Sequence, residues 1–491
     1  MEYTKVIDTT SGQIRGFYEE EGIMCFKGVP YAEPPVGEKR WKRAEPYAHR
    51  DGVRDCTEFG PSCYQNKLDE ISSRIWTTEF VIQNRNYSED CLTLNLWTNE
   101  NKKDMPVVLY FYGGGFVSGG SSCEIYNGVP YAKKGVIYVT FTHREGAFAW
   151  FANEKLSSES EESISGNYML SDAEAALIWI RDNIEKFGGD PKNVTIWGQS
   201  SGASEVNLFQ ISKRMAPYFN KVISMGLNNF PIIYSLPWVT KEGAYEQGRP
   251  LYEAGDGSLE KLREMPAEEF CKHTYIKSPM VDHYYVDDLF RNEIIKGVNP
   301  DITVMMGMVA GDYLMVPLFL PLRGAQNMDE FRNTISRFYP ETCDEIIEEY
   351  HKEDAPFVQS AVAISTDIMY YGLLEYAGTR NKVGKGETYI YVFKHVMPGP
   401  DQEMFGAFHS SEVPYFNDHL SDHRKEWWKP EDHALAKKMN ELMTGFLKEG
   451  KPAIDGFIPS DGTNMFVITA DSQENTVIEP EKIERWKHLF G

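Results

Sequence analysis

Short runs of apolar residues recur along the chain, separated by longer stretches of mixed character. The runs cover residues 107–112, 136–142, 194–197, 303–309, 388–393 and 465–469. They are rich in β-branched and aromatic residues and carry apolar side chains at successive positions. This is typical of strands that are buried on both faces. We therefore expect a sheet that is covered on two sides.

The clearest helical pattern lies between two of these strands, over Ser171–Phe187. Its apolar residues recur at intervals of three and four, at Ala173, Leu177, Ile180, Ile184 and Phe187. This spacing gives a helix one apolar face, and Gly188, Gly189 and Pro191 follow as stop signals. Strands that alternate with helices predict an α/β fold with a mainly parallel sheet.

The chain shows no internal repeat and no linker rich in Pro, Gly or Ser. With 42% hydrophobic residues it can bury a large core. We therefore predict a single domain over residues 1–491. Insertions around residues 64–88 and 230–300 are expected to contribute to a cap over the active site.

A sharp turn is predicted where one strand ends, at residues 194–202 (Val-Thr-Ile-Trp-Gly-Gln-Ser-Ser-Gly). A serine on a strained strand-to-helix turn needs small neighbours, and Gly198 and Gly202 leave that room. The helix N-terminus that follows favours developing negative charge. Gly-x-Ser-x-Gly also occurs by chance, but the strand before it and the helix after it favour a nucleophile at Ser200.

A second glycine-rich loop follows the strand over residues 107–112. Residues 110–120 read Tyr-Phe-Tyr-Gly-Gly-Gly-Phe-Val-Ser-Gly-Gly. Three consecutive glycines are costly to order unless the backbone itself has a role. One such role is to aim main-chain N–H groups at an oxyanion as it develops. A nucleotide loop is disfavoured, because the pattern Gly-x-x-x-x-Gly-Lys-Ser/Thr is missing here.

The charge, the hydropathy and the cysteine spacing of the chain exclude several classes of binding partner. The net charge of −23 disfavours nucleic acid. No stretch approaches the ~20 apolar residues that cross a bilayer, and the N-terminus has no signal pattern. We expect a cytoplasmic protein that does not bind membranes, as a monomer or small homo-oligomer. The seven cysteines show no zinc-binding spacing, and we expect no metal.

Several motifs in a fixed order resemble the type-B carboxylesterase family, which includes the cholinesterases, and in particular its cytoplasmic, bacterial-type members. They are Gly-Val-Pro-Tyr-Ala-Glu-Pro-Pro-Val-Gly (28–37), Ser-Glu-Asp-Cys-Leu-Thr-Leu-Asn (88–95), Tyr-Gly-Gly-Gly-Phe (112–116), Phe-Gly-Gly-Asp-Pro (187–191), the turn at Ser200 and Gly-Ala-Phe-His-Ser-Ser-Glu (406–412). The resemblance spans nearly the whole chain. It implies the α/β-hydrolase fold and a serine hydrolase of small-molecule carboxylic esters without a cofactor.

The resemblance also implies individual roles. Ser200 matches the nucleophile and His409 the general base, while Gly114, Gly115 and Ser201 match the oxyanion donors. Asp312 stands where the family usually has the triad glutamate, and the order serine, acid, histidine is that of this fold. His395 is the main rival for the base. The rivals for the acid are Asp282, Asp287, Asp288 and Asp301.

Other positions match or depart from the family. Gln199 replaces a common glutamate, and the serine that often supports the triad is missing near residues 224–228. This leaves Glu412 as a supporting residue. The resemblance implies the ion pairs Arg40–Glu89 and Arg144–Asp172. It also matches Cys63 and Cys91 to a disulfide of the family, which a reducing cytoplasm would disfavour. Val81 stands where cholinesterases carry a choline-binding tryptophan, with Trp76 out of register, which disfavours acetylcholine.

Two further possibilities stay open. His419 and His423 are four residues apart and could bind a metal on a helix, although their polar surroundings favour a solvated surface. The main hypothesis is hydrolysis of small to medium neutral carboxylic esters through an acyl-enzyme. The same triad could act on amide, carbamate or thioester bonds, and a non-catalytic binding module is the remaining alternative.

Overall fold

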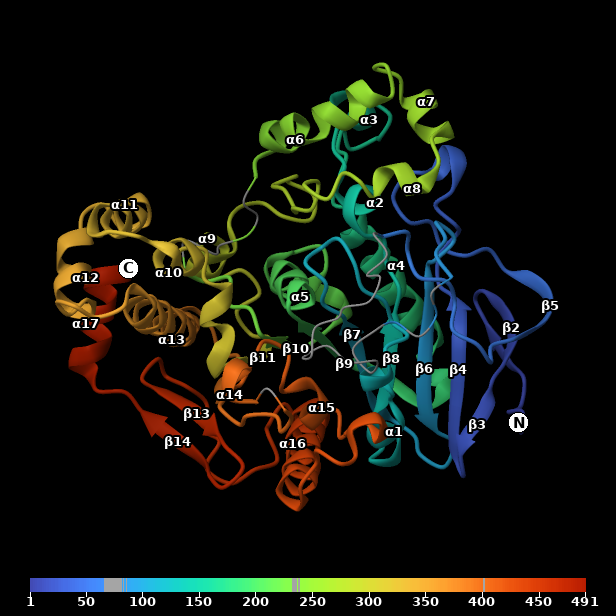
Figure 1. The fold of residues 1–491 in the computed structure, drawn as a ribbon. Coiled ribbons are helices and arrows are strands. Elements are labelled where there is room, and N and C mark those ends of the chain that lie inside the picture. The colour runs from blue at the N-terminus through green and yellow to red at the C-terminus, as the bar shows by residue number, and fades with distance from the viewer. Residues whose placement is uncertain (66–81, 83, 85, 232–235, 237–238, 401) are drawn as a thin grey trace.

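A large twisted sheet forms the centre of the computed structural model, which describes residues 1–65, 82, 84, 86–231, 236, 239–400 and 402–491 (Figure 1). Across the described residues the strands lie in the order β14 (Gln473–Val477), β13 (Asn464–Ile468), β12 (Thr388–Phe393), β11 (Thr303–Val309), β10 (Lys221–Met225), β9 (Gly189–Gln199), β7 (Met105–Phe111), β8 (Ile137–Phe141), β6 (Thr93–Asn99), β4 (Ile23–Pro30) and β3 (Phe17–Glu20). The strands from β13 across to β8 are parallel, and the pairs at both edges are antiparallel. The α/β fold with a mainly parallel sheet is thus confirmed.

The predicted strands agree with the observed ones to within two residues at most bounds, and β9 is the exception. It begins at Gly189, where the sequence predicted only a stop. Gly188 has φ +83° and turns the chain directly from the helix into the strand. A second, small sheet pairs β1 (Ile7–Thr9), β2 (Gly12–Arg15) and β5 (Arg50–Asp55).

Alternating residues of β7 point into two separate apolar cores, one on each face of the sheet. Val107 and Leu109 pack in the core that includes residues of α4 (Tyr168–Asn183), α5 (Ser201–Ile211), α13 (Phe357–Val383) and α17 (Pro480–Phe490). Val108 and Tyr110 pack in the core that includes residues of α1 (Val129–Lys133) and α16 (Pro430–Glu449). This two-sided burial explains the continuous apolar runs in the sequence.

Further helices surround this framework. They are α2 (Gly146–Trp150), α3 (Glu154–Ser158), α6 (Lys241–Ala254), α7 (Leu259–Glu264), α8 (Ala267–Phe270), α9 (Phe290–Ile295), α10 (Phe319–Gly324), α11 (Met328–Phe338), α12 (Cys343–Tyr350), α14 (Gln402–Phe405) and α15 (Val413–Phe416). The 3₁₀ helices are η1 (Gly37–Lys39), η3 (Glu124–Tyr126), η4 (Ile184–Phe187), η5 (Ala216–Tyr218), η7 (Ala310–Met315) and η8 (Asp422–Arg424).

The segment between residues 230 and 300, predicted as an insertion, contains helices. Helices α6, α7 and α8 form a layer at the top of Figure 1, close to α2 and α3. Phe270 of α8 packs edge-on against Phe148 of α2, with ring centroids 5.4 Å apart. That this layer and residues 64–88 cap the active site stays a prediction, because much of 64–88 lies outside the described residues.

Candidate active site

Ser200 lies on the predicted turn between β9 and α5. Its φ of +56° and ψ of −124° are strained for a residue with a side chain. A Cβ atom on Gly198 would collide with the backbone of Gly202, and one on Gly202 would collide with the carbonyl of Phe111. The glycines of the Gly-x-Ser-x-Gly pattern are therefore required by packing. Parallel pairing of β9 with β7 and β10 places Ser200 at the carboxyl end of central strands.

Three segments bring a serine, a histidine and an aspartate into one hydrogen-bonded row. His409 Nε2 lies 2.8 Å from Ser200 Oγ, and His409 Nδ1 lies 2.6 Å from Asp312 Oδ1. Asp312 is completely buried in η7 after β11, and its Oδ2 accepts a hydrogen bond from the Val309 N–H at 2.9 Å. The carboxylate is thus held by the backbone with one oxygen free for His409, the arrangement that fixes a histidine tautomer.

Burial and the contact with Asp312 act in opposite directions on the pKa of His409. Burial lowers the pKa of His409, but the adjacent carboxylate outweighs this, and the pKa lies above its ordinary value of 6.5. The carboxylate therefore favours the protonated ring that forms when His409 takes a proton from the serine.

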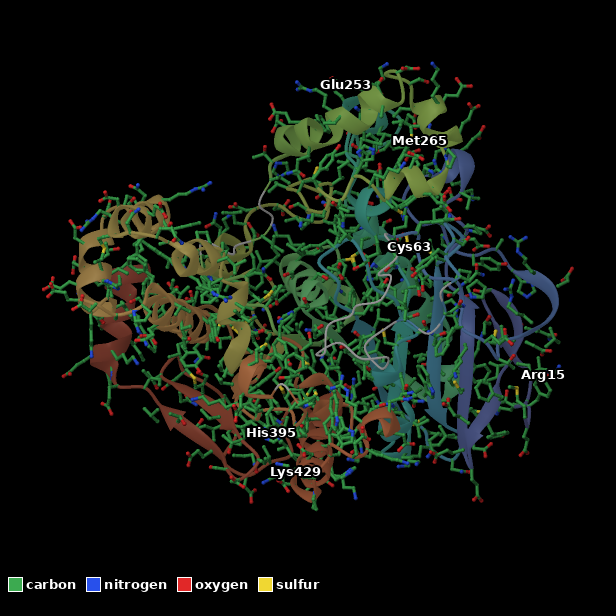
Figure 2. All side chains as sticks on the ribbon, viewed as in Figure 1. Arg15, Cys63, Glu253, Met265, His395 and Lys429 are labelled. Carbon is green, nitrogen blue, oxygen red and sulfur yellow. The ribbon has the colours of Figure 1, made fainter. Side chains whose placement is uncertain are left out.

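The residues that the sequence offered as alternatives for the base and the acid contact other groups. His395 Nε2 contacts Asp432 Oδ1 at 2.7 Å, and Asp432 Oδ2 accepts from the N–H of Lys429 at the start of α16. His395 and Lys429 are labelled in Figure 2. Asp282 accepts from the backbone N–H groups of residues 284, 285 and 286. The other acids contact lysines or the backbone elsewhere, namely Asp287 with Lys213, Asp288 with Lys296 and Asp301 with the N–H of Lys385.

The glycine loop over residues 113–115 lies against Ser200. A Cβ atom on Gly113 would come within 2.7 Å of Ser200 Cβ, so the backbone approaches the serine closely. Gly114 and Gly115 have φ of +147° and +65°. Ser201 is the first residue of α5, and its N–H has no acceptor within the helix. That Gly114, Gly115 and Ser201 form an oxyanion hole stays a prediction, which the close approach of this loop to Ser200 supports.

The supporting residues Gln199 and Glu412 differ in their contacts. Gln199 Nε2 donates to Ser410 Oγ at 2.6 Å, next to His409 in the chain. Glu412 is completely buried, and neither of its carboxyl oxygens has a hydrogen-bond partner within the described residues. Burial, followed by the charge of Asp312, raises the pKa of Glu412 to about 8. Gly226, rather than a serine, faces the His409 ring.

Both ion pairs implied by the sequence are present. Arg40 Nε donates to Glu89 at 2.7 Å, and Arg40 Nη1 donates to the carbonyl oxygens of Leu262 and Met265, which ties the start of the chain to the α7 region. The buried Arg144 guanidinium contacts Asp172 at 2.6 Å. These pairs fix segments around the site without touching Ser200.

The structure describes the residues of the predicted disulfide and metal pair, but not those of the choline site. Cys63 and Cys91 are buried free thiols that contact each other. His419 and His423 both contact Glu124, and no group of three metal-binding side chains occurs within the described residues. Val81 and Trp76 lie outside the described residues. In the described part of the chain, no helix is long and apolar enough to cross a membrane.

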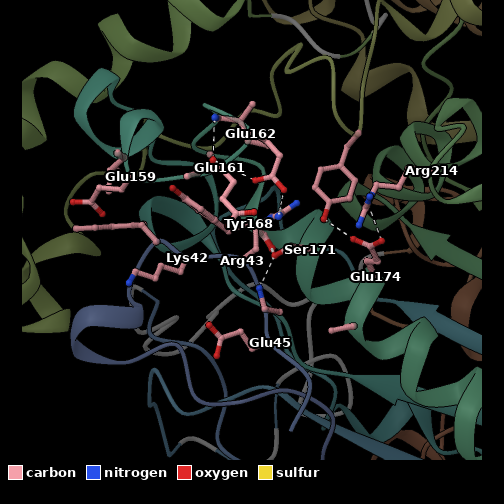
Figure 3. A pocket seen from close by; sticks show the side chains of 18 of the residues that line it. Lys42, Arg43, Glu45, Glu159, Glu161, Glu162, Tyr168, Ser171, Glu174 and Arg214 are labelled. Carbon is pink, nitrogen blue, oxygen red and sulfur yellow. Dashed lines mark hydrogen bonds and ion pairs between the residues drawn. The ribbon is translucent and has the colours of Figure 1, made fainter.

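One cavity of about 380 Å³ lies away from the triad, between residues 41–46, residues 156–166 and α4 (Figure 3). Its walls carry paired charges. Arg214 contacts the buried Glu174 at 2.8 Å, and Tyr285 donates to the same carboxylate at 2.7 Å. The charges of Arg214 and Glu174 are therefore satisfied within this wall of the cavity.

Sequence reasoning missed three buried residues beside the glycine loop, His143, Glu145 and Glu205. The available signal was the charge of Glu145 four residues after the end of β8, and of Glu205 inside an apolar helix segment. That they meet could not be read from the sequence, since they come from different elements.

The fold and this site define a carboxylic-ester hydrolase with the α/β-hydrolase fold. Residues 3–485 match the carboxylesterase family, and the chain belongs to that family. A fumonisin B1 esterase of Sphingopyxis macrogoltabida is 31% identical over 421 residues, covering 83% of this chain and 74% of that protein. An acetylcholinesterase of Bungarus fasciatus is 37% identical over 50% of this chain and 39% of its own length.

Solved structures share the fold over nearly the whole chain. A PNB esterase superposes with a TM-score of 0.82 at 24% identity, covering 99% of both chains. A carboxylesterase of Geobacillus stearothermophilus gives 0.79 at 25% identity, covering 99% of this chain and 100% of that one.

Proposed function

We propose that the protein hydrolyses small to medium, neutral carboxylic esters through an acyl-enzyme on Ser200. The observation that carries this proposal is the row of hydrogen bonds from Ser200 Oγ through His409 to Asp312, at 2.8 and 2.6 Å. A serine hydroxyl is a weak nucleophile unless a base takes its proton during attack. His409 is in hydrogen-bond contact with that hydroxyl and is oriented by Asp312.

In the first half of the reaction, Ser200 Oγ attacks the ester carbonyl carbon while His409 Nε2 takes the hydroxyl proton. The carbonyl oxygen becomes an oxyanion that accepts hydrogen bonds from the N–H groups of Gly114, Gly115 and Ser201. The C–O bond to the alcohol then breaks, and His409 returns its proton to the leaving oxygen. The acyl group stays on Ser200.

In the second half, water attacks the acyl carbon while His409 takes one of its protons. Collapse of this intermediate releases the carboxylic acid and returns the proton to Ser200 Oγ. Asp312 stays ionised throughout and stabilises the imidazolium that forms twice per cycle. No cofactor enters these steps, because proton transfer and oxyanion stabilisation suffice for acyl transfer.

Preference for neutral esters is supported by the uncharged Gln199 beside Ser200, which leaves no fixed negative charge there to attract a cationic alcohol. Hydrolysis of a p-nitrophenyl ester by wild type and Ser200→Ala tests the proposal. We expect Ser200→Ala to lose activity by about 10⁶. Retention of wild-type turnover in that variant would overturn the role of Ser200. Comparing kcat/KM for a matched ester and amide tests the bond preference.

A further inference from the structure

Three ionisable side chains that the proposed mechanism does not use are buried beside residues 113–115. They are His143, Glu145 and Glu205, and each is at most 3% exposed. His143 and Glu145 follow β8, and Glu205 lies in the second turn of α5. His143 Nδ1 lies 3.5 Å from Glu145 Oε1, and His143 Nε2 lies 3.9 Å from Glu205 Oε2. They form one cluster, named here the buried acid cluster.

The buried acid cluster is joined to both ends of the glycine loop. Tyr112, which precedes the loop, stacks on the His143 ring with centroids 4.4 Å apart and planes at 6°. The His143 N–H also donates to the Tyr112 hydroxyl at 3.3 Å. After the loop, the carbonyl of Phe116 accepts from the N–H of Gly146 at 2.8 Å. A shift of residues 143–146 therefore moves the backbone of residues 113–115.

The hydrogen bonds indicate where the protons lie. His143 Nδ1 is 3.1 Å from the carbonyl oxygen of Arg144, which can only accept, so Nδ1 carries the ring proton. Burial lowers the pKa of His143 to about 4, which keeps the ring neutral and leaves Nε2 as a bare acceptor. Within the described residues neither His143 Nε2 nor Glu205 Oε2 has a hydrogen-bond partner. The 3.9 Å between these two atoms is too long for a hydrogen bond, and only as a neutral acid does Glu205 carry a proton that Nε2 could accept at closer approach.

We propose that His143, Glu145 and Glu205 are positioning residues for the oxyanion loop, and that the loop is held in its active geometry only while both carboxyls are neutral. This inference rests on the oxyanion role proposed for residues 113–115. Two carboxylates in these apolar surroundings would repel each other and draw in water. They would also oppose the negative charge that develops on the substrate oxygen.

Burial supports this protonation state. It raises the pKa values of Glu145 and Glu205 well above their ordinary range, and their mutual repulsion adds to the effect at Glu145. The other groups that act on Glu145 are the Cys63 thiol, the Tyr112 hydroxyl and Asp172.

These neighbours do not account for an alkaline transition. Burial raises the pKa values of Cys63 and Tyr112 far above their ordinary values. Cys91 lies against Cys63 as a second buried thiol. Asp172 is paired with Arg144. An alkaline transition of the loop is therefore assigned to the two glutamates.

The decisive variant is Glu205→Gln, which keeps an N–H donor and the side-chain size but cannot ionise. Turnover of p-nitrophenyl acetate is measured from about pH 6 to about pH 10, with Ser200→Ala subtracted as background. We expect wild-type kcat to fall about tenfold per pH unit above the transition while KM stays nearly constant. In Glu205→Gln the fall shifts to higher pH, and kcat near neutral pH stays within about twofold of wild type.

Glu205→Leu removes the donor altogether. We expect Glu205→Leu to lower kcat near neutral pH by about 10-fold to 100-fold with little change in KM. Turnover near neutral pH is thus kept with Gln at residue 205 and lost with Leu. Circular dichroism checks its folding. If Leu prevents folding, the Gln profile alone decides. The matched control is Glu174→Gln, a buried carboxyl in the cavity of Figure 3, which should keep the wild-type alkaline fall.

An alkaline fall in Glu205→Gln at the same pH as in wild type overturns the inference. The inference is also overturned if the alkaline fall in kcat disappears in Glu412→Gln but not in Glu205→Gln, because the transition would then belong to the carboxyl beside the triad. Failure of the proposed function is distinguishable, since it appears as hydrolysis that survives Ser200→Ala at every pH.

Discussion

His409 Nδ1 lies 2.6 Å from Asp312 Oδ1, and this contact joins the loops that follow two neighbouring parallel strands, β11 and β12. Aspartate is one methylene shorter than the usual glutamate of the family. The close approach is possible because the N–H of Gly311 donates to the carbonyl of Ala407 at 2.8 Å, which holds the two loops together. The backbone thus compensates for the shorter acid.

Asp312→Asn tests the orienting role of this carboxyl. The amide removes the charge that fixes the His409 tautomer, so we expect kcat on a p-nitrophenyl ester to fall by about 10⁴ with KM little changed. Asp301→Asn is the matched control, because Asp301 is exposed and accepts from the N–H of Lys385, away from the triad. Equal turnover of Asp312→Asn and wild type would exclude Asp312 as the triad acid.

The raised pKa of His409 predicts opposite pH effects on activity and stability. Only the neutral ring acts as a base, so kcat/KM should fall with decreasing pH, with a midpoint above 6.5. The stability from the His409–Asp312 pair is fully present below 6.5 and is lost as pH rises through the folded pKa. A pH profile of kcat/KM checks the first effect, and a midpoint below 6.5 contradicts it.

Glu412 should destabilise the fold as it approaches ionisation. Its folded pKa of about 8 exceeds the ordinary 4.5, so its contribution to stability is present below 4.5 and is lost as pH rises to about 8. The stability of Glu412→Gln relative to wild type should therefore increase across this window. Urea unfolding at several pH values measures it, and a constant difference would show that Glu412 ionises normally.

Gly113→Ala tests how closely the oxyanion loop must approach Ser200. The added Cβ atom would lie 2.7 Å from both Ser200 Cβ and Gln199 Oε1, so the loop must shift. A displacement of this kind costs about 10² in kcat. Gly324→Ala is the control, since open space surrounds that position. Equal kcat for both variants, measured on one p-nitrophenyl ester, would contradict the proposed loop geometry.

The Arg144–Asp172 pair should matter more for folding than for chemistry. Both side chains are buried, so Arg144→Met leaves an unpaired carboxylate and should lower the free energy of unfolding by about 3–5 kcal/mol. The exposed pair Arg181–Asp182 provides the control, with a loss of about 1 kcal/mol or less for Arg181→Met. Urea denaturation compares them, and similar losses would contradict the buried-pair argument.

The sequence predicted the features that have strict local requirements. The turn at Ser200 could be located because only glycine fits at residues 198 and 202. The strands could be located because both of their faces are buried. Asp312 could be placed by its position after a strand, together with the family resemblance.

Features that depend on contacts between distant segments could not be predicted. The meeting of His143 with Glu205 depends on how α5 packs beside the end of β8. The bond between Gln199 and Ser410 joins residues 211 positions apart. The early start of β9 depends on the left-handed conformation of Gly188, which a stop signal does not distinguish from a turn into a strand.

The most direct test of the account is the identification of the acylated residue. The protein is mixed with p-nitrophenyl acetate, quenched in acid within the first turnover, digested and analysed by mass spectrometry. We predict an acetyl group on the peptide that contains Ser200, together with a burst of one p-nitrophenolate per active chain. An acetyl group on another residue, or steady turnover without any acyl-enzyme, would contradict the assignment of Ser200 as the nucleophile.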